Sequence, residues 1–149
     1  MTVCLVPCAQ TELDAKRTPI ILCIDDDPDI TRTIELRLSR YEVEVMCNFT
    51  GMQGFWQAVQ HKPDLIITDL RMPQGDGEHL IECLKRNQAA AAIPVIVISG
   101  QQGQRVESQV FRLGADSFFH KPISYDMLID EINSYIQLRE KIADDPHVR

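Results

Sequence analysis

Five polar residues of this sequence stand where short apolar runs end. Three are the acids Asp25, Asp26 and Asp69, and the other two are the hydroxyl residue Ser99 and the cation Lys121. Neighbouring carboxylates repel each other unless a cation lies between them. Mg²⁺ suits so small an acidic group, because it is usually held by one or two carboxylates together with water and phosphate oxygens, whereas Ca²⁺ takes more oxygens. A carboxylate beside such a metal and a lysine can also act as a nucleophile and form an aspartyl-phosphate.

The apolar runs have the length and composition of buried strands. The sequence predicts strands at residues 20–24, 43–46, 65–68, 94–99 and 116–120. Segments of helical length separate these strands, and most of them carry apolar residues at helical spacing. In chain order, the stripes are Ile30, Ile34 and Leu38; Leu80, Ile81 and Leu84; Val106, Val110 and Leu113; and Leu128, Ile132, Tyr135 and Ile136. The second helix, expected around residues 54–60 and including Trp56, has the weakest pattern.

Asp27 is expected to begin a helix rather than to bind a metal, because it stands directly before Pro28. An acid at the N-cap accepts a backbone N–H that would otherwise lack a partner, and proline at the first helical position has no N–H to satisfy. Gly114 is expected to end the fourth helix, since glycine readily adopts the left-handed conformation that follows many helices.

Strands and helices alternate along the chain, which predicts an α/β domain with a parallel sheet. The expected fold is a doubly wound (βα)5 flavodoxin-like three-layer sandwich with a five-stranded sheet in the order 2-1-3-4-5. The carboxyl ends of parallel strands lie along one edge of such a sheet, where ligands bind. Strands one and three are neighbours in this order. Asp25 or Asp26 is therefore expected beside Asp69, with Ser99 and Lys121 approaching from strands four and five.

The length and charge of the chain limit the possible functions. A chain of 149 residues has room for one ordinary domain. The folded core is expected at residues 19–141, with residues 1–18 as an N-terminal extension and 142–149 as a C-terminal tail. The net charge of −7 and the scattered lysines and arginines argue against direct binding to nucleic acid.

Apolar content and cysteine usage indicate a location. No apolar run reaches the length needed to cross a bilayer, so no membrane insertion is expected. The five cysteines are odd in number and are expected to behave as small hydrophobes in a reducing compartment. A cytoplasmic protein is therefore expected.

Together, four motifs resemble the response-regulator receiver domain of two-component signalling. ILCIDDDPDI is similar to the first strand with its acidic pair, and DLIITDLRMPQGDG to the phosphoacceptor strand and loop. PVIVISG is similar to the fourth strand with its hydroxyl, and FFHKPI to the lysine-proline segment. The resemblance covers about residues 19–141 and implies a stand-alone receiver. Such a switch accepts a phosphoryl group from a histidine kinase or phosphotransfer protein, with Mg²⁺ or Mn²⁺ as cofactor.

The resemblance also implies a role for each residue of the site. Asp69 would be the phosphoacceptor. Asp25, Asp26 and the backbone carbonyl of Arg71 would bind the metal together with Asp69. Lys121 would form a salt bridge to the phosphoryl group.

Ser99 and Phe118 would couple phosphorylation to a change of shape. Ser99 stands where the family has its switch hydroxyl, and Phe118 where it has a rotating aromatic residue. Phenylalanine keeps the packing part of this switch and removes any contact through a phenol hydroxyl. The peptide bond before Pro122 is expected to be cis. A downstream protein, unknown from the sequence, would bind the face formed by the fourth helix, the fifth strand and the fifth helix.

Two other functions remain as alternatives, a Mg²⁺-dependent phosphohydrolase that uses an aspartyl-phosphate and a non-phosphorylated scaffold. Leu70 and Arg71 follow Asp69, so the second acid that such phosphohydrolases carry two residues later is missing. The scaffold is disfavoured because every residue of the site is present. The chain is therefore not expected to be an enzyme, beyond assisting its own phosphorylation and dephosphorylation.

Overall fold

The computed structural model describes residues 17–72, 76–101 and 103–142. The expected N-terminal extension and C-terminal tail therefore lie almost wholly outside the described residues. The strands are β1 (Ile20–Ile24), β2 (Glu44–Asn48), β3 (Leu65–Asp69), β4 (Val95–Ser99) and β5 (Ser117–His120). The helices are α2 (Pro28–Leu38), α3 (Gly51–His61), α4 (Gly77–Arg86), α5 (Gln104–Leu113) and α6 (Tyr125–Tyr135).

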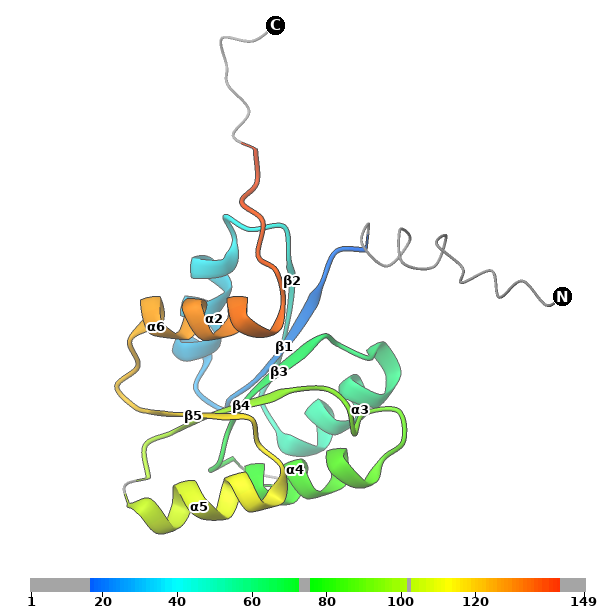
Figure 1. The fold of residues 1–149 in the computed structure, drawn as a ribbon, viewed down its shortest axis with the longest axis vertical. Helices are drawn as coiled ribbons and strands as arrows, with labels where there is room; N and C mark the ends of the chain where they lie inside the picture. Colours follow the sequence, from blue (N-terminus) through cyan, green and yellow to red (C-terminus); the bar gives the residue numbers. More distant parts are fainter. Residues whose placement is uncertain (1–16, 73–75, 102, 143–149) are drawn as a thin grey trace, which may run out of the picture.

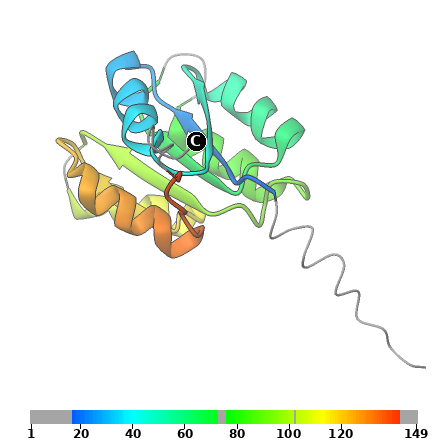
Figure 2. The same cartoon turned by 90° about the horizontal axis from the view of Figure 1, so that it is seen from above.

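The sheet is parallel throughout and has the order β2-β1-β3-β4-β5, which confirms the expected fold class. Figure 1 shows the sheet between two helical layers, with α2 and α6 on one face and α3, α4 and α5 on the other. Figure 2 shows the same layers from above. One apolar cluster joins the sheet to α3, α4 and α5, and a second joins it to α2 and α6. No helix within the described ranges has the length and hydropathy to span a bilayer.

The two central strands of this sheet explain the continuous apolar runs of the sequence. Every position of β3 and β4 is buried, because helices cover both faces of the sheet. The edge strand β2 is mostly half-buried, and it runs to Asn48, past the end expected at residue 46. An edge strand has a neighbour on one side only, so its apolar pattern marks its end poorly. Helix α3 begins earlier than expected, because the Thr50 hydroxyl caps it by accepting the Gln53 N–H at 3.2 Å.

The expected helix boundaries at Asp27 and Gly114 are confirmed. The Asp27 carboxylate accepts the Asp29 N–H at 3.0 Å, and Pro28 is the first residue of α2. Gly114 follows α5 in the left-handed conformation, with a φ of 113°. Both signals are local, which is why the sequence alone could place them.

A short segment after α6 contacts the loop before β2. The Glu42 N–H donates to the carbonyl of Arg139 at 2.7 Å, and the Lys141 N–H donates to the carbonyl of Arg40 at 2.8 Å. Leu138, between α6 and these contacts, packs against the apolar cluster that α2 and α6 share. The segment therefore ties the end of the last helix to the loop before β2.

Candidate functional site

Three carboxylates meet at the edge where β1 and β3 end. Ile24 pairs with Thr68 in the sheet, so the following residues, Asp25 and Asp69, are neighbours. Both are buried, at 5% and 6% exposure, whereas Asp26 is exposed. One carboxylate oxygen from each of the three acids lies within 4.8 Å of the others. A group of hard oxygen ligands that is open to water on one side fits Mg²⁺.

Lys121 lies against the two buried acids. Its Nζ is 3.0 Å from Asp25 Oδ2 and 3.1 Å from Asp69 Oδ2. The lysine directly follows β5, and its N–H donates to the carbonyl of Ser99 at 2.9 Å, which holds it beside the end of β4. The peptide bond between Lys121 and Pro122 is cis, as expected. The ammonium therefore reaches both acids from the end of the edge strand β5.

The electrostatics of this cluster favour a cation. Burial raises the pKa of the Asp25 carboxyl, and the charge of Asp69 adds to this effect, while the Asp27 N–H and Lys121 oppose it. Burial alone would lower the pKa of Lys121. Its hydrogen bonds to the two acids and their negative charges outweigh burial, and they raise the pKa. The lysine is thus held in its charged form, and a further cation would relieve the remaining repulsion between the acids.

Backbone groups fix the orientation of the two buried carboxylates. The Asp27 N–H donates to Asp25 Oδ1 at 2.9 Å, and the Leu70 N–H donates to Asp69 Oδ1 at 2.7 Å. The remaining Oδ2 of each acid accepts from Lys121. Each carboxylate is therefore held from both sides, which limits its rotation.

Ser99 lies beside Asp69 at a solvent-facing cavity. The cavity has a volume of about 350 Å³, and it is lined by Asp69, Arg71, Ser99, Gly100, Gln101 and Lys121. The Ser99 side chain is buried, and its hydroxyl accepts the Gln101 N–H at 3.1 Å. A group bound to Asp69 would therefore meet a hydroxyl and an ammonium in the same space.

Gln101 is a residue of this cavity that sequence reasoning missed. With its amide oxygen turned toward Arg71, Gln101 accepts from the guanidinium, with Nη2 at 2.9 Å and Nε also in contact. The Arg71 side chain thus spans the cavity, although only its carbonyl was expected to matter. The available signal was position, since Gln101 comes two residues after Ser99 at the end of β4.

Phe118 lies outside the lining of this cavity. It pairs with Val97 in the sheet, whereas Ser99 pairs with His120, so Phe118 lies two positions back along the same face. Its ring is half-buried against the apolar cluster of α3, α4 and α5, and it meets the His120 ring edge to face at 4.8 Å. The structure therefore gathers Asp25, Asp26, Asp69, Ser99 and Lys121 and places Phe118 behind Ser99.

The loop after Asp69 is held to the beginning of α4. The Gly77 N–H donates to the carbonyl of Leu70 at 2.7 Å. A Cβ on Gly77 would collide with the backbone oxygen of Asp69 and lie 2.7 Å from Leu70 Cα. Only glycine permits this approach, so α4 is anchored to the backbone of the site.

The chain is similar to several curated regulators. It is 32% identical over 124 residues to the DNA-binding dual master transcriptional regulator RpaA of Synechocystis, covering 83% of this chain and 52% of that protein. It is 34% identical over 125 residues to the transcriptional regulatory protein KdpE of Staphylococcus aureus, covering 83% and 50%. Protein PilG of Pseudomonas aeruginosa is 28% identical over 116 residues, covering 78% and 86%. The chain thus spans about half the length of the first two relatives.

Solved structures and a family model agree with this similarity. A response regulator receiver protein from Pseudomonas putida aligns with a TM-score of 0.73 and 28% identity, covering 79% of this chain and 98% of that one. A receiver domain of a Francisella response regulator aligns with a TM-score of 0.73 and 26% identity, covering 78% and 95%. The model of the response regulator receiver domain matches residues 21–133. Because the match extends from the first strand into the last helix, the chain belongs to the family of response regulator receiver domains.

Proposed function

We propose that this protein accepts a phosphoryl group on Asp69 from a histidine kinase or phosphotransfer protein, in a reaction that requires Mg²⁺ or Mn²⁺. Receiver domains of two-component response regulators are phosphorylation-controlled switches, and the chain belongs to that family. The observation that carries the assignment is the position of Asp69, whose carboxylate adjoins the other acids, Lys121 and the cavity. The receiver unit would comprise residues 19–141.

In the transfer, an oxygen of Asp69 attacks the phosphorus of the donor. The bond between phosphorus and the donor's nitrogen or oxygen breaks, and its electron pair leaves with the donor. Asp25, Asp26, Asp69 and the carbonyl of Arg71 would hold the metal ion, which when bound neutralises charge on the phosphoryl oxygens. The hydrogen bond from the Leu70 N–H would keep Asp69 turned toward the cavity.

Lys121 and Ser99 would stabilise the phosphorylated form. The Lys121 ammonium already touches Asp69 Oδ2, so it is placed to pair with a phosphoryl oxygen on that side. The Ser99 hydroxyl lines the same cavity and would donate to another phosphoryl oxygen. Movement of Ser99 toward the phosphoryl group would free space for Phe118, which lies behind it on the same face of the sheet.

The partners would act at two stages. A histidine kinase or phosphotransfer protein would dock over the cavity, and an unknown downstream protein would bind the face of α5, β5 and α6. We propose no direct contact with nucleic acid, because the net charge is −7. DNA binding is part of the name of the Synechocystis relative, of which this chain spans about half the length.

We propose a switch rather than an enzyme that acts on other substrates. A phosphohydrolase of this kind carries a second acid two residues after the nucleophile, whereas this chain has Arg71 at that position. A cytoplasmic location would fit the thiols, since Cys23, Cys47 and Cys83 are free.

Treatment with acetyl phosphate tests the phosphoacceptor directly. Intact-mass analysis should detect one phosphoryl adduct on the wild type in Mg²⁺ and none in excess chelator. Asp69→Asn should carry no adduct, because its amide is not a nucleophile, and it should keep the fold because the two side chains have the same shape. Asp130→Asn changes an exposed acid of α6 in the same way and should react like the wild type. An adduct on Asp69→Asn, or an equal yield in chelator, would overturn the assignment.

A further inference from the structure

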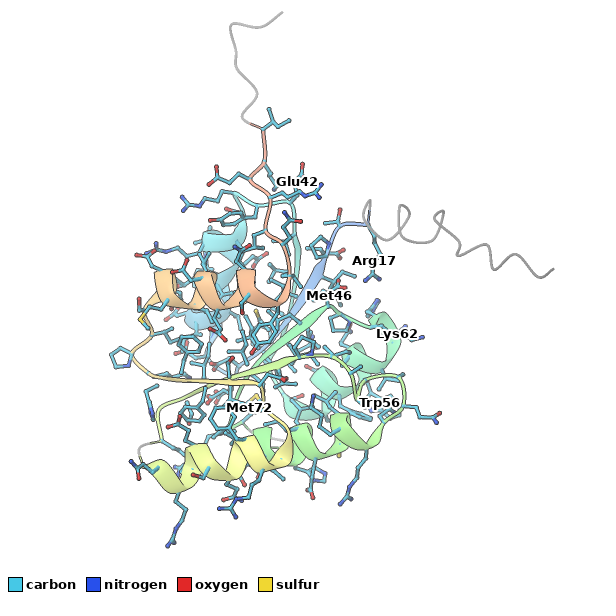
Figure 3. All side chains as sticks on the ribbon, in the orientation of Figure 1. Arg17, Glu42, Met46, Trp56, Lys62 and Met72 are labelled. Carbon is cyan, nitrogen blue, oxygen red and sulfur yellow. The ribbon has the colours of Figure 1, made fainter. Side chains whose placement is uncertain are left out.

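Helix α3 has a solvent face of unusual composition. Among the five helices of the described part of the chain, α3 alone contains no Asp, Glu, Lys or Arg. Its exposed residues are Met52, Gln53, Trp56, Gln60 and His61, with Met52 and Trp56 at 61% and 63% exposure. Phe49, just before the helix, is also exposed, and Figure 3 shows Trp56 on this helix. Solvent-facing helix surfaces usually carry charges, so this face is suited to contact with another surface.

The exposed face continues into a groove between α3 and α4. The groove has a volume of about 390 Å³, and it is lined by Gly51, Met52 and Phe55 from α3, by His79, Leu80 and Cys83 from α4, and by Asp76. Met52 belongs to both the exposed face and the groove, so the two form one surface. We call this surface, from Phe49 and α3 to the groove, the α3 patch.

We propose that the α3 patch is the contact surface between two copies of this chain. Each copy carries a net charge of −7, so two copies repel each other wherever acidic surfaces approach. The α3 patch brings a helix without Asp, Glu, Lys or Arg to the contact and so reduces that repulsion. The exposed side chains of Met52 and Trp56 in this patch are apolar and can pack against the same side chains of a second copy, as a two-fold symmetric interface requires.

The charges at the two ends of the α3 patch favour an antiparallel arrangement. Lys62 follows the last residue of α3, and it is exposed there (Figure 3). Asp76 lines the groove at the opposite end, beside Gly51 and Met52. Two α3 helices packed antiparallel would bring Lys62 of each copy toward Asp76 of the other. A parallel arrangement would instead place like charges together.

The position of the α3 patch keeps it separate from the surfaces proposed for signalling. Helix α4 lies between α3 and α5, so a dimer through α3 leaves α5, β5 and α6 free (Figure 1). We therefore expect the contact to form without phosphorylation of Asp69. Self-association and phosphoryl transfer can be measured separately, and either can fail without the other.

Sedimentation of the full chain across a dilution series tests the proposal without any phosphodonor. The wild type should pass from dimer to monomer on dilution, and the Trp56 emission should shift to longer wavelength as the indole becomes exposed. Met52→Glu should raise the dimer dissociation constant by roughly tenfold or more, because it places two like charges in the contact. Lys62→Glu should also weaken the dimer, by loss of the attraction to Asp76.

Leu36→Glu is the matched control. The exposed fraction of Leu36, 63%, is similar to that of Met52, 61%, but Leu36 lies on α2, on the opposite face of the sheet from α3. The Leu36→Glu variant should leave the dimer dissociation constant unchanged. Circular dichroism should show that all three variants are folded. A wild type that stays monomeric at every concentration overturns the proposal, as does a dimer that Met52→Glu leaves intact. If deletion of residues 1–16 exposes Trp56 in a monomer, the N-terminal segment covers the α3 patch and the second copy does not.

Discussion

Lys121 is the residue on which the electrostatics of the site depend. Its ammonium is within 3.1 Å of carboxylate oxygens of both Asp25 and Asp69, and it compensates two buried negative charges at once. Removal of one partner from a buried ionic contact leaves the other partner desolvated and unpaired. The lysine therefore supports the fold of the site.

Lys121→Ala should lower the free energy of unfolding by about 2 kcal/mol in the absence of divalent cations. Addition of Mg²⁺ should restore more stability to this variant than to the wild type, because the metal takes over the neutralisation of Asp25 and Asp69. Urea unfolding with and without Mg²⁺ measures both effects. Lys141→Ala removes an exposed lysine and is the control. An equal gain from Mg²⁺ in the variant and the wild type would show that Lys121 and the metal do not share the same acids.

At the scale of the elements, the beginning of α4 and the end of β3 form one unit. The Gly77 N–H bonds to the Leu70 carbonyl, and the Thr68 hydroxyl donates to the Asp69 carbonyl at 2.9 Å. Gly77 has no side chain, so the helix can approach the strand end this closely. The position of the loop after Asp69 thus depends on the first residue of the next helix.

Gly77→Ala should destabilise the protein by about 2 kcal/mol or more and should slow phosphorylation by acetyl phosphate. The added Cβ would clash with backbone atoms of Asp69 and Leu70, which cannot move away as a flexible side chain would. Thermal unfolding and the rate of adduct formation measure the two effects. Gly100→Ala is the control for stability, because a Cβ there would meet nothing within 4 Å. Equal melting temperatures for the two variants would contradict the close approach at Gly77.

In the molecule as a whole, the segment after α6 joins distant parts of the chain. Its contacts join residues 138–141 to residues 40–42, which are far apart in the sequence. The family model ends at residue 133, so these contacts extend beyond the matched part of the chain. The segment holds α6 and the loop before β2 together on one side of the sheet.

Deletion of residues 137–149 should lower the free energy of unfolding by roughly 2 to 3 kcal/mol. The deletion removes the partly buried Leu138 side chain and two backbone hydrogen bonds. Deletion of residues 143–149 alone keeps all of these contacts and should have little effect. Chemical unfolding of the two truncated proteins beside the wild type makes the comparison. Equal stability of the longer deletion and the wild type would mean that the segment contributes nothing to the fold.

Local patterns in the sequence predicted the elements and the chemistry available at their ends. Apolar runs of strand length, helical stripes and caps such as Asp27 depend on neighbours within a few residues, so local pattern was sufficient. The placement of Asp25 or Asp26 beside Asp69 also followed from the sequence, because parallel strands share one carboxyl edge. The structure shows that Asp25 is the buried neighbour of Asp69. Even the weakly patterned second helix was placed correctly, although its beginning at Gly51 was missed.

The contacts between side chains of different elements were not predictable from these local patterns. The contact of Arg71 with Gln101, the closeness of Gly77 to Asp69 and the groove beside Trp56 all join residues from different elements. Such contacts depend on the rotamers and on the packing distance between a helix and its neighbours. No periodicity along the chain encodes these quantities, because packing selects them only once the layers have come together.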